Sequence, residues 1–269
     1  MQRRRFLSAS LAASAAALAR TAGAQAAAAS HSREFYQIRR YTLQSEMPPA
    51  PQAGLTERYI ADALIPALTR RGMGPVGAFR LEFGPETPQL YVLIPGPSAE
   101  ALATLDLDLA NDSEFLKAAD PFWNAPASNP PFIRVEYSLL AAFEGWPRVT
   151  PPPAAATHAH RLYQLRTYES PSYRDHVRKV EMFHHGEFDV FKAAGFNLVF
   201  FGDTIVGPRM PNLTYMLSAP DGAALEAHWI AFRDNPDWKK LASDPRYAYE
   251  AIVSNITNYV LSPLPVSQV

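Results

Sequence analysis

An internal repeat restricts the fold of this chain of 269 residues more than any other feature of its sequence. Tyr36–Tyr41 (YQIRRY) matches Tyr163–Tyr168 (YQLRTY), 127 residues later. Gly84–Leu90 matches Gly207–Leu213, 123 residues later. Ordered matches at nearly one spacing indicate that the chain contains two copies of one unit in tandem.

A third match supports the repeat and helps to place its boundary. Asp112–Phe115 pairs with Asn235–Trp238 at the 123-residue offset. Between the copies lies Arg148–Ala156, which contains three consecutive prolines. Proline cannot donate a backbone hydrogen bond, so this run excludes helix and sheet and favours an extended polyproline spacer. We expect a first repeat over 33–147, a linker over 148–158 and a second repeat over 159–265.

Hydrophobic periodicity predicts the same order of elements in each copy, most clearly in the second. The second copy should contain strands at 160–168, 197–206, 213–218 and 252–261, and helices at 173–194 and 221–241, the latter broken near Asn235. The order β-α-β-β-α-β is the ferredoxin-like plan, an antiparallel sheet with both helices on one face. Since one such sheet leaves its other face bare, we expect the two sheets to pack face to face as an α+β barrel. The alternative is two separate domains on a linker.

Four motifs of the second copy have counterparts in a known family. They are Leu165–Tyr168 in the first strand, His185–Glu187 in the first helix, Val206–Met216 in the central hairpin, and Asn235–Trp238. On these motifs, residues 160–263 resemble the NIPSNAP family of the dimeric α+β barrel superfamily. The resemblance implies a barrel fold shared with cofactor-free monooxygenases and isomerases and with haem-dependent chlorite dismutases and peroxidases. It implies no particular reaction.

Alternation in the first strand of each copy separates a polar face from an apolar one. The polar faces carry Gln37, Arg39 and Tyr41 in the first copy and Gln164, Arg166 and Tyr168 in the second. The apolar faces carry Tyr36, Ile38, Tyr163 and Leu165. We expect the polar faces to line the inside of the barrel and the apolar faces to pack under the helices.

Guanidinium groups hold carboxylates and carbonyls through paired hydrogen bonds, so two arginines inside the barrel would bind a ligand with an anionic or carbonyl end. The candidate ligand-binding residues are Arg39, Arg166, Gln164, Tyr168 and Tyr215. In the alternative, each arginine pairs with a buried acid or binds backbone carbonyls at the barrel mouth. The aromatic residues Phe200, Phe201, Tyr215, Trp229, Phe232 and Trp238 are assigned to the core, and the alternative is that some of them line an apolar pocket.

Glu187 is the candidate catalytic residue. Its spacing from Phe183 and Val190 places it in the buried stripe of a helix, where the first copy has Leu64. A buried carboxylate must carry a raised pKa or meet a cation, such as Arg166 or Arg178. It would act as a general base or orient a ligand. The alternative is a structural carboxylate with a paired charge.

Metal and cofactor sites are not expected. The chain has no cysteine, which excludes disulfides, thiolate-bound metals and thiol nucleophiles. His184 and Glu187 share a helix face, but His185 points away, and a catalytic zinc or iron needs three ligands. The sequence also lacks a Gly-x-Ser-x-Gly elbow and a glycine-rich phosphate loop.

The first 26 residues resemble a twin-arginine export signal. Arg3–Arg5 precede an alanine-rich stretch and then small residues that allow cleavage after Ala24 or Ala26. The apolar stretch is about half the ~20 residues that a membrane span needs. Without residues 1–26 the net charge is −5, which argues against nucleic acid and anionic lipid as partners. We expect a periplasmic or secreted protein. In the alternative, residues 1–26 are not a signal but the basic start of an ordinary surface helix.

Two functional hypotheses remain. In the first, the barrel binds a small molecule that is apolar with a polar or anionic end, and cofactor-free oxygenase or isomerase chemistry could follow. In the second, the chain is a non-enzymatic binding or interaction module. An enzyme should have an enclosed pocket with a perturbed acid or base, whereas a binding module should have a filled barrel or an exposed apolar patch. Self-association of whole chains is compatible with both.

Overall fold

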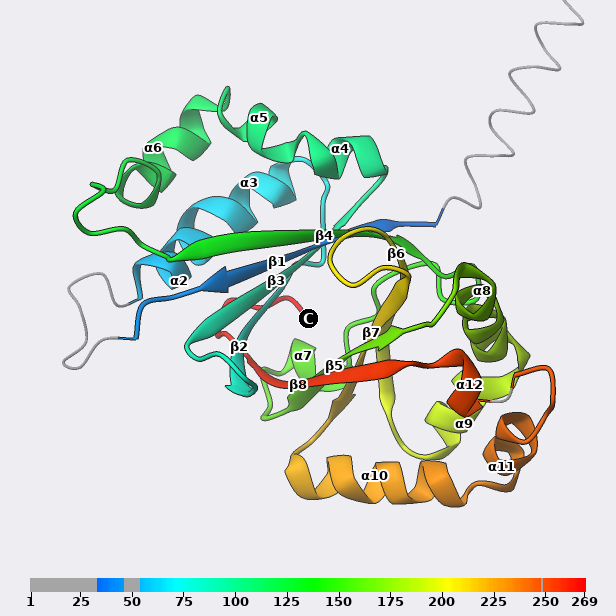
Figure 1. The fold of residues 1–269 in the computed structure, drawn as a ribbon. Coiled ribbons are helices and arrows are strands. Elements are labelled where there is room, and N and C mark those ends of the chain that lie inside the picture. Colours follow the sequence, from blue (N-terminus) through cyan, green and yellow to red (C-terminus); the bar gives the residue numbers. More distant parts are fainter. Residues whose placement is uncertain (1–32, 46–53, 248) are drawn as a thin grey trace, which may run out of the picture. The chain divides into compact units, whose positions relative to one another are not determined.

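Eight antiparallel strands close into a barrel in the computed structural model, which describes residues 33–45, 54–247 and 249–269 (Figure 1). The strands are β1 (Phe35–Thr42), β2 (Gly77–Phe83), β3 (Gln89–Gly96), β4 (Arg134–Ala142), β5 (Leu162–Glu169), β6 (Asn197–Val206), β7 (Asn212–Ala219) and β8 (Asn255–Pro263). Their order around the barrel is β1-β3-β2-β8-β5-β7-β6-β4. The expected export signal over 1–26 lies outside the described residues.

The barrel closes where the two halves of the chain meet. β2 pairs with β8 at one junction and β4 pairs with β6 at the other, both antiparallel. These pairings leave no strand of the barrel with an open edge, which protects it from pairing with other chains. The structure thus confirms the predicted mixed α+β fold and its closed antiparallel barrel, and excludes the alternative of two separate domains on a linker.

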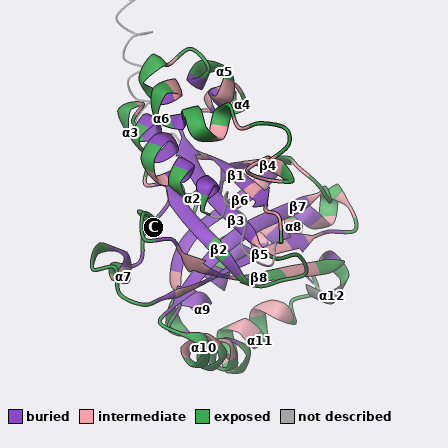
Figure 2. Cartoon of the chain, turned by 90° about the vertical axis from the view of Figure 1, so that its left-hand side faces the viewer, coloured by how far each residue is buried: buried purple, intermediate pink, exposed green. Residues whose placement is uncertain are grey.

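Helices cover the outer faces of both halves. The first half has α2 (Leu55–Tyr59), the π-helical turn η1 (Ile60–Leu64), α3 (Ile65–Arg70), α4 (Ala99–Ala103), α5 (Leu105–Leu109) and α6 (Ser113–Trp123). The second has α8 (Tyr173–Met182), the π-helical turn η2 (Phe183–Glu187), α9 (Phe188–Ala193), α10 (Gly222–Asp234), α11 (Pro236–Ala242) and α12 (Tyr249–Ile252). Figure 2 shows the helices exposed on the side away from the buried strands. No helix among the described residues is long and apolar enough to cross a membrane.

The third repeated motif of the sequence is a helix start in both halves. The Asp112 carboxylate accepts a hydrogen bond from the Phe115 amide and caps α6. The Asn235 side chain accepts hydrogen bonds from the amides of Asp237 and Trp238 and caps α11. Asp and Asn are favoured there because their side chains satisfy amides that the first helical turn leaves without partners.

The interior of the barrel is filled with side chains. Its core includes Tyr36, Phe79, Leu93, Leu140, Tyr163, Leu165, Phe200, Met216, Leu261 and the C-terminal Val269. Tyr36 packs edge-on against Phe200 with 5.3 Å between ring centroids, and Phe79 packs against Tyr163 at 4.8 Å. An eight-stranded barrel is just wide enough for its inward side chains to fill it. The expectation of a ligand inside the barrel stays a prediction, although this core occupies the space between the strands.

Two local expectations also differ from the structure. The proline-rich linker contains a short helix, α7 (Pro153–Ala156). Pro152 is extended, but Pro153 is at the first helical position, where proline's missing amide costs nothing. Ile252, expected to begin the last strand, ends α12 and packs against Met182 and Tyr247.

Candidate functional site

Arg39 and Arg166 lie on the outer face of the barrel, beneath the helices. Their neighbours Tyr36 and Tyr163 point into the barrel, whereas Tyr41 and Tyr168 pack in the cores under the helices. The predicted alternation is present, but the assignment of its faces is inverted. Alternation defines two faces without saying which one is inside, and both are covered here.

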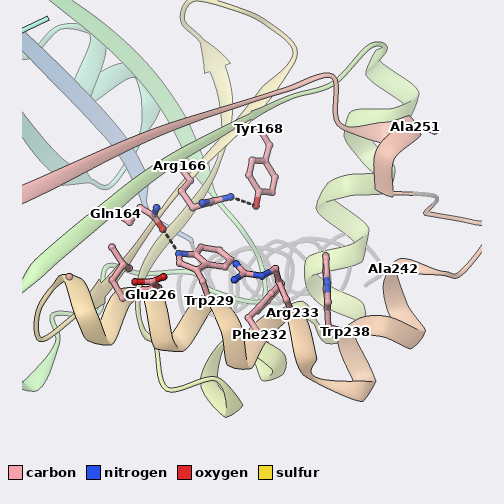
Figure 3. Close-up of a pocket in the computed structure, with 12 residues that line it drawn as sticks. Gln164, Arg166, Tyr168, Glu226, Trp229, Phe232, Arg233, Trp238, Ala242 and Ala251 are labelled. Carbon is pink, nitrogen blue, oxygen red and sulfur yellow. Dashed lines mark hydrogen bonds between the residues drawn. The ribbon is translucent and has the colours of Figure 1, made fainter. Parts of the chain in front are cut away.

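A cleft of about 1080 Å³ opens between β5 and the helices α10 to α12 (Figure 3). Three of the predicted ligand-binding residues line it on β5, namely Gln164, Arg166 and Tyr168. The facing wall includes Leu225, Glu226, Trp229, Phe232, Arg233 and Trp238. The cleft therefore combines a polar strand with a helical wall that carries three aromatic rings, and apolar rings with a few polar groups are the usual composition of a small-molecule site.

Arg166 is held in a defined position within this cleft. Its Nη2 donates to the Tyr168 hydroxyl at 3.0 Å, and its guanidinium carbon lies 4.3 Å from the centroid of the Trp229 ring. The Trp229 indole in turn donates to Gln164 Oε1 at 2.7 Å. Figure 3 shows these groups facing one another across the cleft. A cation stacked on an indole and fixed from both sides is oriented before any ligand arrives.

Tyr215 lies behind Tyr168 and does not line the cleft. Its hydroxyl donates to the Tyr168 hydroxyl at 2.8 Å, and its side chain is fully buried. Burial raises the pKa of the Tyr215 phenol well above its ordinary value, and the Arg166 guanidinium opposes that rise. Tyr215 therefore supports Tyr168 as a neutral hydrogen-bond donor. Its predicted contact with a ligand could only be indirect.

Glu187 is buried as predicted, but its partner is a residue that the sequence reasoning missed. Glu187 Oε2 lies 2.5 Å from Lys179 Nζ, and both side chains are almost completely buried. Burial raises the pKa of Glu187, while Lys179 and then Arg166 oppose the rise. Arg178, the other expected partner, pairs with Asp175 instead. The signal was available, because Lys179, Phe183 and Glu187 are spaced by four and share a helix ridge.

The Lys179–Glu187 pair is next to the cleft without lining it. Lys179 Nζ lies 5.2 Å from the Tyr168 ring centroid and 5.8 Å from that of Trp238, and both rings line the cleft. The carboxylate that does line the cleft is Glu226, which is exposed on α10. The geometry therefore places Glu187 behind the site, in contact with its walls. A catalytic role for Glu187 stays a prediction.

His184 and His185, which are neighbours in η2, bond to different partners. His184 accepts a hydrogen bond from the Gly145 amide through Nε2, and its Nδ1 bonds the Val180 carbonyl. His185 bonds the Tyr247 hydroxyl. Among the described residues, no group of three or more His, Asp or Glu side chains is placed to hold a metal ion.

Three solved structures share the fold over most of both chains. Proposed monooxygenases from Lactobacillus acidophilus NCFM and Fusobacterium nucleatum align with TM-scores of 0.53 and 0.52, at 10% and 8% identity. They cover 86% and 87% of this chain and 94% of their own. An anthrone oxidase-like protein aligns with a TM-score of 0.51 at 11% identity, over 86% of this chain and 92% of its own. At these identities the likeness concerns the fold alone.

The sequence comparison agrees with the resemblance of the motifs. No curated protein matches this sequence. The NIPSNAP family model matches residues 163–268, which include β5 from its second residue, β6 to β8 and every residue that lines the cleft. Residues 163–268 of this chain are therefore similar to the NIPSNAP domain.

Proposed function

We propose that the cleft between β5 and α10 binds a small molecule with an aromatic or apolar body and an anionic end. The observation that carries this proposal is the position of Arg166. This residue lines a cleft of about 1080 Å³, and its guanidinium carbon lies 4.3 Å from the centroid of the Trp229 ring. A guanidinium in this position offers hydrogen bonds to a carboxylate or phenolate, and the rings beside it accept an aromatic body.

The charges of the cleft favour an anion over a neutral ligand. Two guanidinium groups, those of Arg166 and Arg233, line it together with one carboxylate, that of Glu226. Glu226 and Arg233 are exposed, so water screens both of them, whereas Arg166 is partly buried. The charge that a bound ligand meets most strongly is therefore positive.

The binding experiment uses the four tryptophans of the chain, Trp123, Trp146, Trp229 and Trp238, as reporters. The whole chain is labelled with 5-fluorotryptophan, each ¹⁹F resonance is assigned with a Trp→Phe variant, and 1-naphthoate is titrated. We expect saturable shifts at Trp229 and Trp238, which line the cleft, and none at Trp146, which packs against Phe188 and Phe201. Native mass spectrometry of the purified protein would search for a ligand that copurifies.

Arg166→Met tests the role of the cation. Hydrogen bonds to charged groups contribute about 1.5–3 kcal/mol, so the variant should bind naphthoate at least about tenfold more weakly. Arg174→Gln is the matched control, because Arg174 is exposed on α8 and lies outside the cleft. Equal naphthoate affinity in the wild type and Arg166→Met would reject the proposal.

Oxidation of the bound molecule is a second candidate function. It is supported by the fold match, over 86% of this chain, to a proposed monooxygenase and to an anthrone oxidase-like protein. Anthrone is a suitable probe, because loss of a methylene proton turns it into an anion with an aromatic body, and its methylene carbon becomes a ketone when dioxygen supplies one oxygen atom and the other leaves as water. Consumption of dissolved oxygen that depends on the protein and is abolished in Arg166→Met would support oxidation. Binding without oxygen consumption would leave the first proposal standing and dismiss this one.

We further propose that the two halves are tandem ferredoxin-like repeats over 33–147 and 159–265. The strand registers support this. Arg39 pairs with Val92 in the first half, and Arg166 pairs with Tyr215 in the second. Arg166 follows Arg39 by 127 residues and Tyr215 follows Val92 by 123 residues, which are the offsets of the sequence matches. The strands also lie in the same spatial order in both halves: β4-β1-β3-β2 in the first and β8-β5-β7-β6 in the second. Both also have a π-helical turn at corresponding places, η1 and η2.

Export to the periplasm is proposed from the basic, apolar and small-residue order of residues 1–26. A fusion of residues 1–35 to a folded reporter should reach the periplasm. The same fusion with Arg3 and Arg4 changed to Lys should stay inside the cell, and its normal export would refute the twin-arginine assignment.

A further inference from the structure

A second cleft, of about 410 Å³, lies in the first half of the chain, where the outer face of β1 and β4 meets α2, α6 and the segment before β4. It is lined by Arg39, Tyr41, Tyr59, Asp106, Phe122, Trp123, Phe132 and Tyr137, among others. Arg39 occupies the position in β1 that Arg166 occupies in β5. The surroundings of the two arginines differ, and this difference sets what each cleft can bind.

Arg39 has one nitrogen that makes no hydrogen bond of normal geometry in the described part of the chain. Its side chain is 1% exposed. Nε donates to Gln37 Oε1 at 2.6 Å, and Nη1 lies 2.9 Å from Asp106 Oδ1. Nη2 is buried and makes no hydrogen bond of normal geometry there, although the charge of the guanidinium and a weak hydrogen bond from it oppose the rise in pKa that burial gives the Tyr41 phenol. A buried donor without an acceptor is costly, so this atom favours a ligand oxygen.

The charge of Arg39 is already balanced. Asp106 forms the ion pair, and the Tyr137 hydroxyl donates to the other carboxylate oxygen of Asp106 at 2.7 Å. Arg39 and Asp106 are the two charged residues among those that line this cleft, so its net charge is zero. A second carboxylate would compete with Asp106 for the guanidinium. A neutral carbonyl oxygen would accept from Nη2 without disturbing the pair.

The walls of the cleft suit a flat aromatic body. The Tyr59 and Phe122 rings stack with centroids 3.8 Å apart, and Phe132 packs edge-on against Tyr41 at 6.2 Å. At the rim, Trp123 is 37% exposed and Tyr137 is 42% exposed. These exposed rings lie beside a buried donor, so the aromatic ring of a ligand can stack on them and can reach the cleft from solvent.

We propose that this first-half cleft is a separate binding site for a neutral aromatic carbonyl compound, whose oxygen accepts a hydrogen bond from Arg39 Nη2. The chain then has two sites at corresponding places with different selectivity. The cleft beside Arg166 takes an anion, and the cleft beside Arg39 takes an uncharged molecule.

The same fluorine-labelled chain tests this site independently, because Trp123 lines this cleft and the other three tryptophans do not. The probes are 1-acetonaphthone, a neutral ketone, and 1-naphthoate, an anion of similar shape. We expect acetonaphthone to shift the Trp123 resonance saturably and to bind there at least tenfold more tightly than naphthoate. A Trp123 resonance that acetonaphthone does not move would overturn the proposal, whatever naphthoate does at Trp229 and Trp238.

Two variants test the chemistry of the site. Arg39→Lys keeps a cation for Asp106 but removes Nη2, so acetonaphthone affinity at Trp123 should fall at least tenfold. Asp106→Asn removes the balancing charge, so naphthoate affinity at Trp123 should rise at least tenfold, and this variant carries the test if Arg39→Lys fails to fold. Arg134→Gln, which changes an exposed residue of β4 outside both clefts, is the control. An unchanged affinity in Arg39→Lys or an unchanged selectivity in Asp106→Asn would overturn the assignment.

Discussion

Lys179 and Glu187 form an ion pair that water hardly reaches, at 0% and 1% exposure. In the first half, at the 123-residue offset, Thr56 and Leu64 occupy the corresponding positions, and both are buried. One half therefore folds with a hydroxyl and a hydrocarbon where the other holds an ion pair. Desolvation of two charges can cost more than their attraction returns.

The buried pair can be replaced together but not singly. Lys179→Met leaves the Glu187 carboxylate without its nearest cation and should lower the free energy of unfolding by about 3–5 kcal/mol. The double variant Lys179→Met/Glu187→Leu should be as stable as the wild type or more stable, because hydrocarbon fills the space of both charges. Urea unfolding followed by circular dichroism measures both. A double variant less stable than the wild type would show that the pair itself stabilises the fold.

The pH dependence of stability follows from the raised pKa of Glu187. Its pKa is above the ordinary 4.5, so the folded protein holds this proton more tightly than the unfolded chain does. The contribution of Glu187 to stability is therefore full below pH 4.5 and is lost as the pH rises through the folded pKa. Relative to Glu187→Gln, the wild type should lose stability over that range. A relative gain with rising pH would mean that Lys179 outweighs burial and lowers the pKa.

At the scale of elements, the first helix of the second half turns sharply within η2. Gly186 has φ of 141° there, outside the range that residues with a side chain normally adopt. A Cβ at this position would come no closer than 3.8 Å to Leu241, so space is not the constraint. The backbone conformation requires the glycine, and this turn carries Glu187 toward Lys179.

Gly186→Ala should therefore destabilise the protein through backbone strain alone, by about 1–3 kcal/mol. Gly222→Ala is the matched control, because Gly222 begins α10 with ordinary backbone angles and open space around its Cα. Thermal unfolding of the two variants gives the comparison. Equal melting temperatures for both would indicate that η2 relaxes into a regular helix at no cost.

At the scale of the whole molecule, one chain supplies both sheets of the barrel. β2 and β8 join at one junction and β4 and β6 at the other, so each half covers the other's apolar face. Tyr163, Leu165 and Leu261 share one core with Tyr36, Phe79 and Leu140 of the first half. Whether whole chains associate further stays a prediction.

Residues 159–269 expressed alone should dimerise. The fragment exposes the edges of β6 and β8 together with the inner face of its sheet, and a second copy would cover all three. Size-exclusion chromatography with light scattering measures its mass, with the whole chain as the reference. A soluble, cooperatively folded monomer would show that half a barrel is stable without a partner sheet.

Local patterns in the sequence determined much of this fold. The internal repeat predicted two sheets in one chain and their closure into a barrel. Strand 197–206 has the expected bounds, and the second helix breaks at Asn235, where proline and a capping side chain coincide. The stripe of Phe183 and Val190 predicted the burial of Glu187, because helical spacing alone decides which residues share a face.

Only the tertiary structure decided which face of each first strand is inside, and with it the place of the site. Polar residues are usually assigned to the wetter side, but here the inside of the barrel is filled by Tyr36 and Tyr163, whereas the gaps between strands and helices hold Arg39 and Arg166. The partners of these arginines come from remote elements, Asp106 from α5 and Trp229 from α10. Residue spacing determines faces within one element, but contacts between elements depend on how the barrel closes and how closely each helix packs on it.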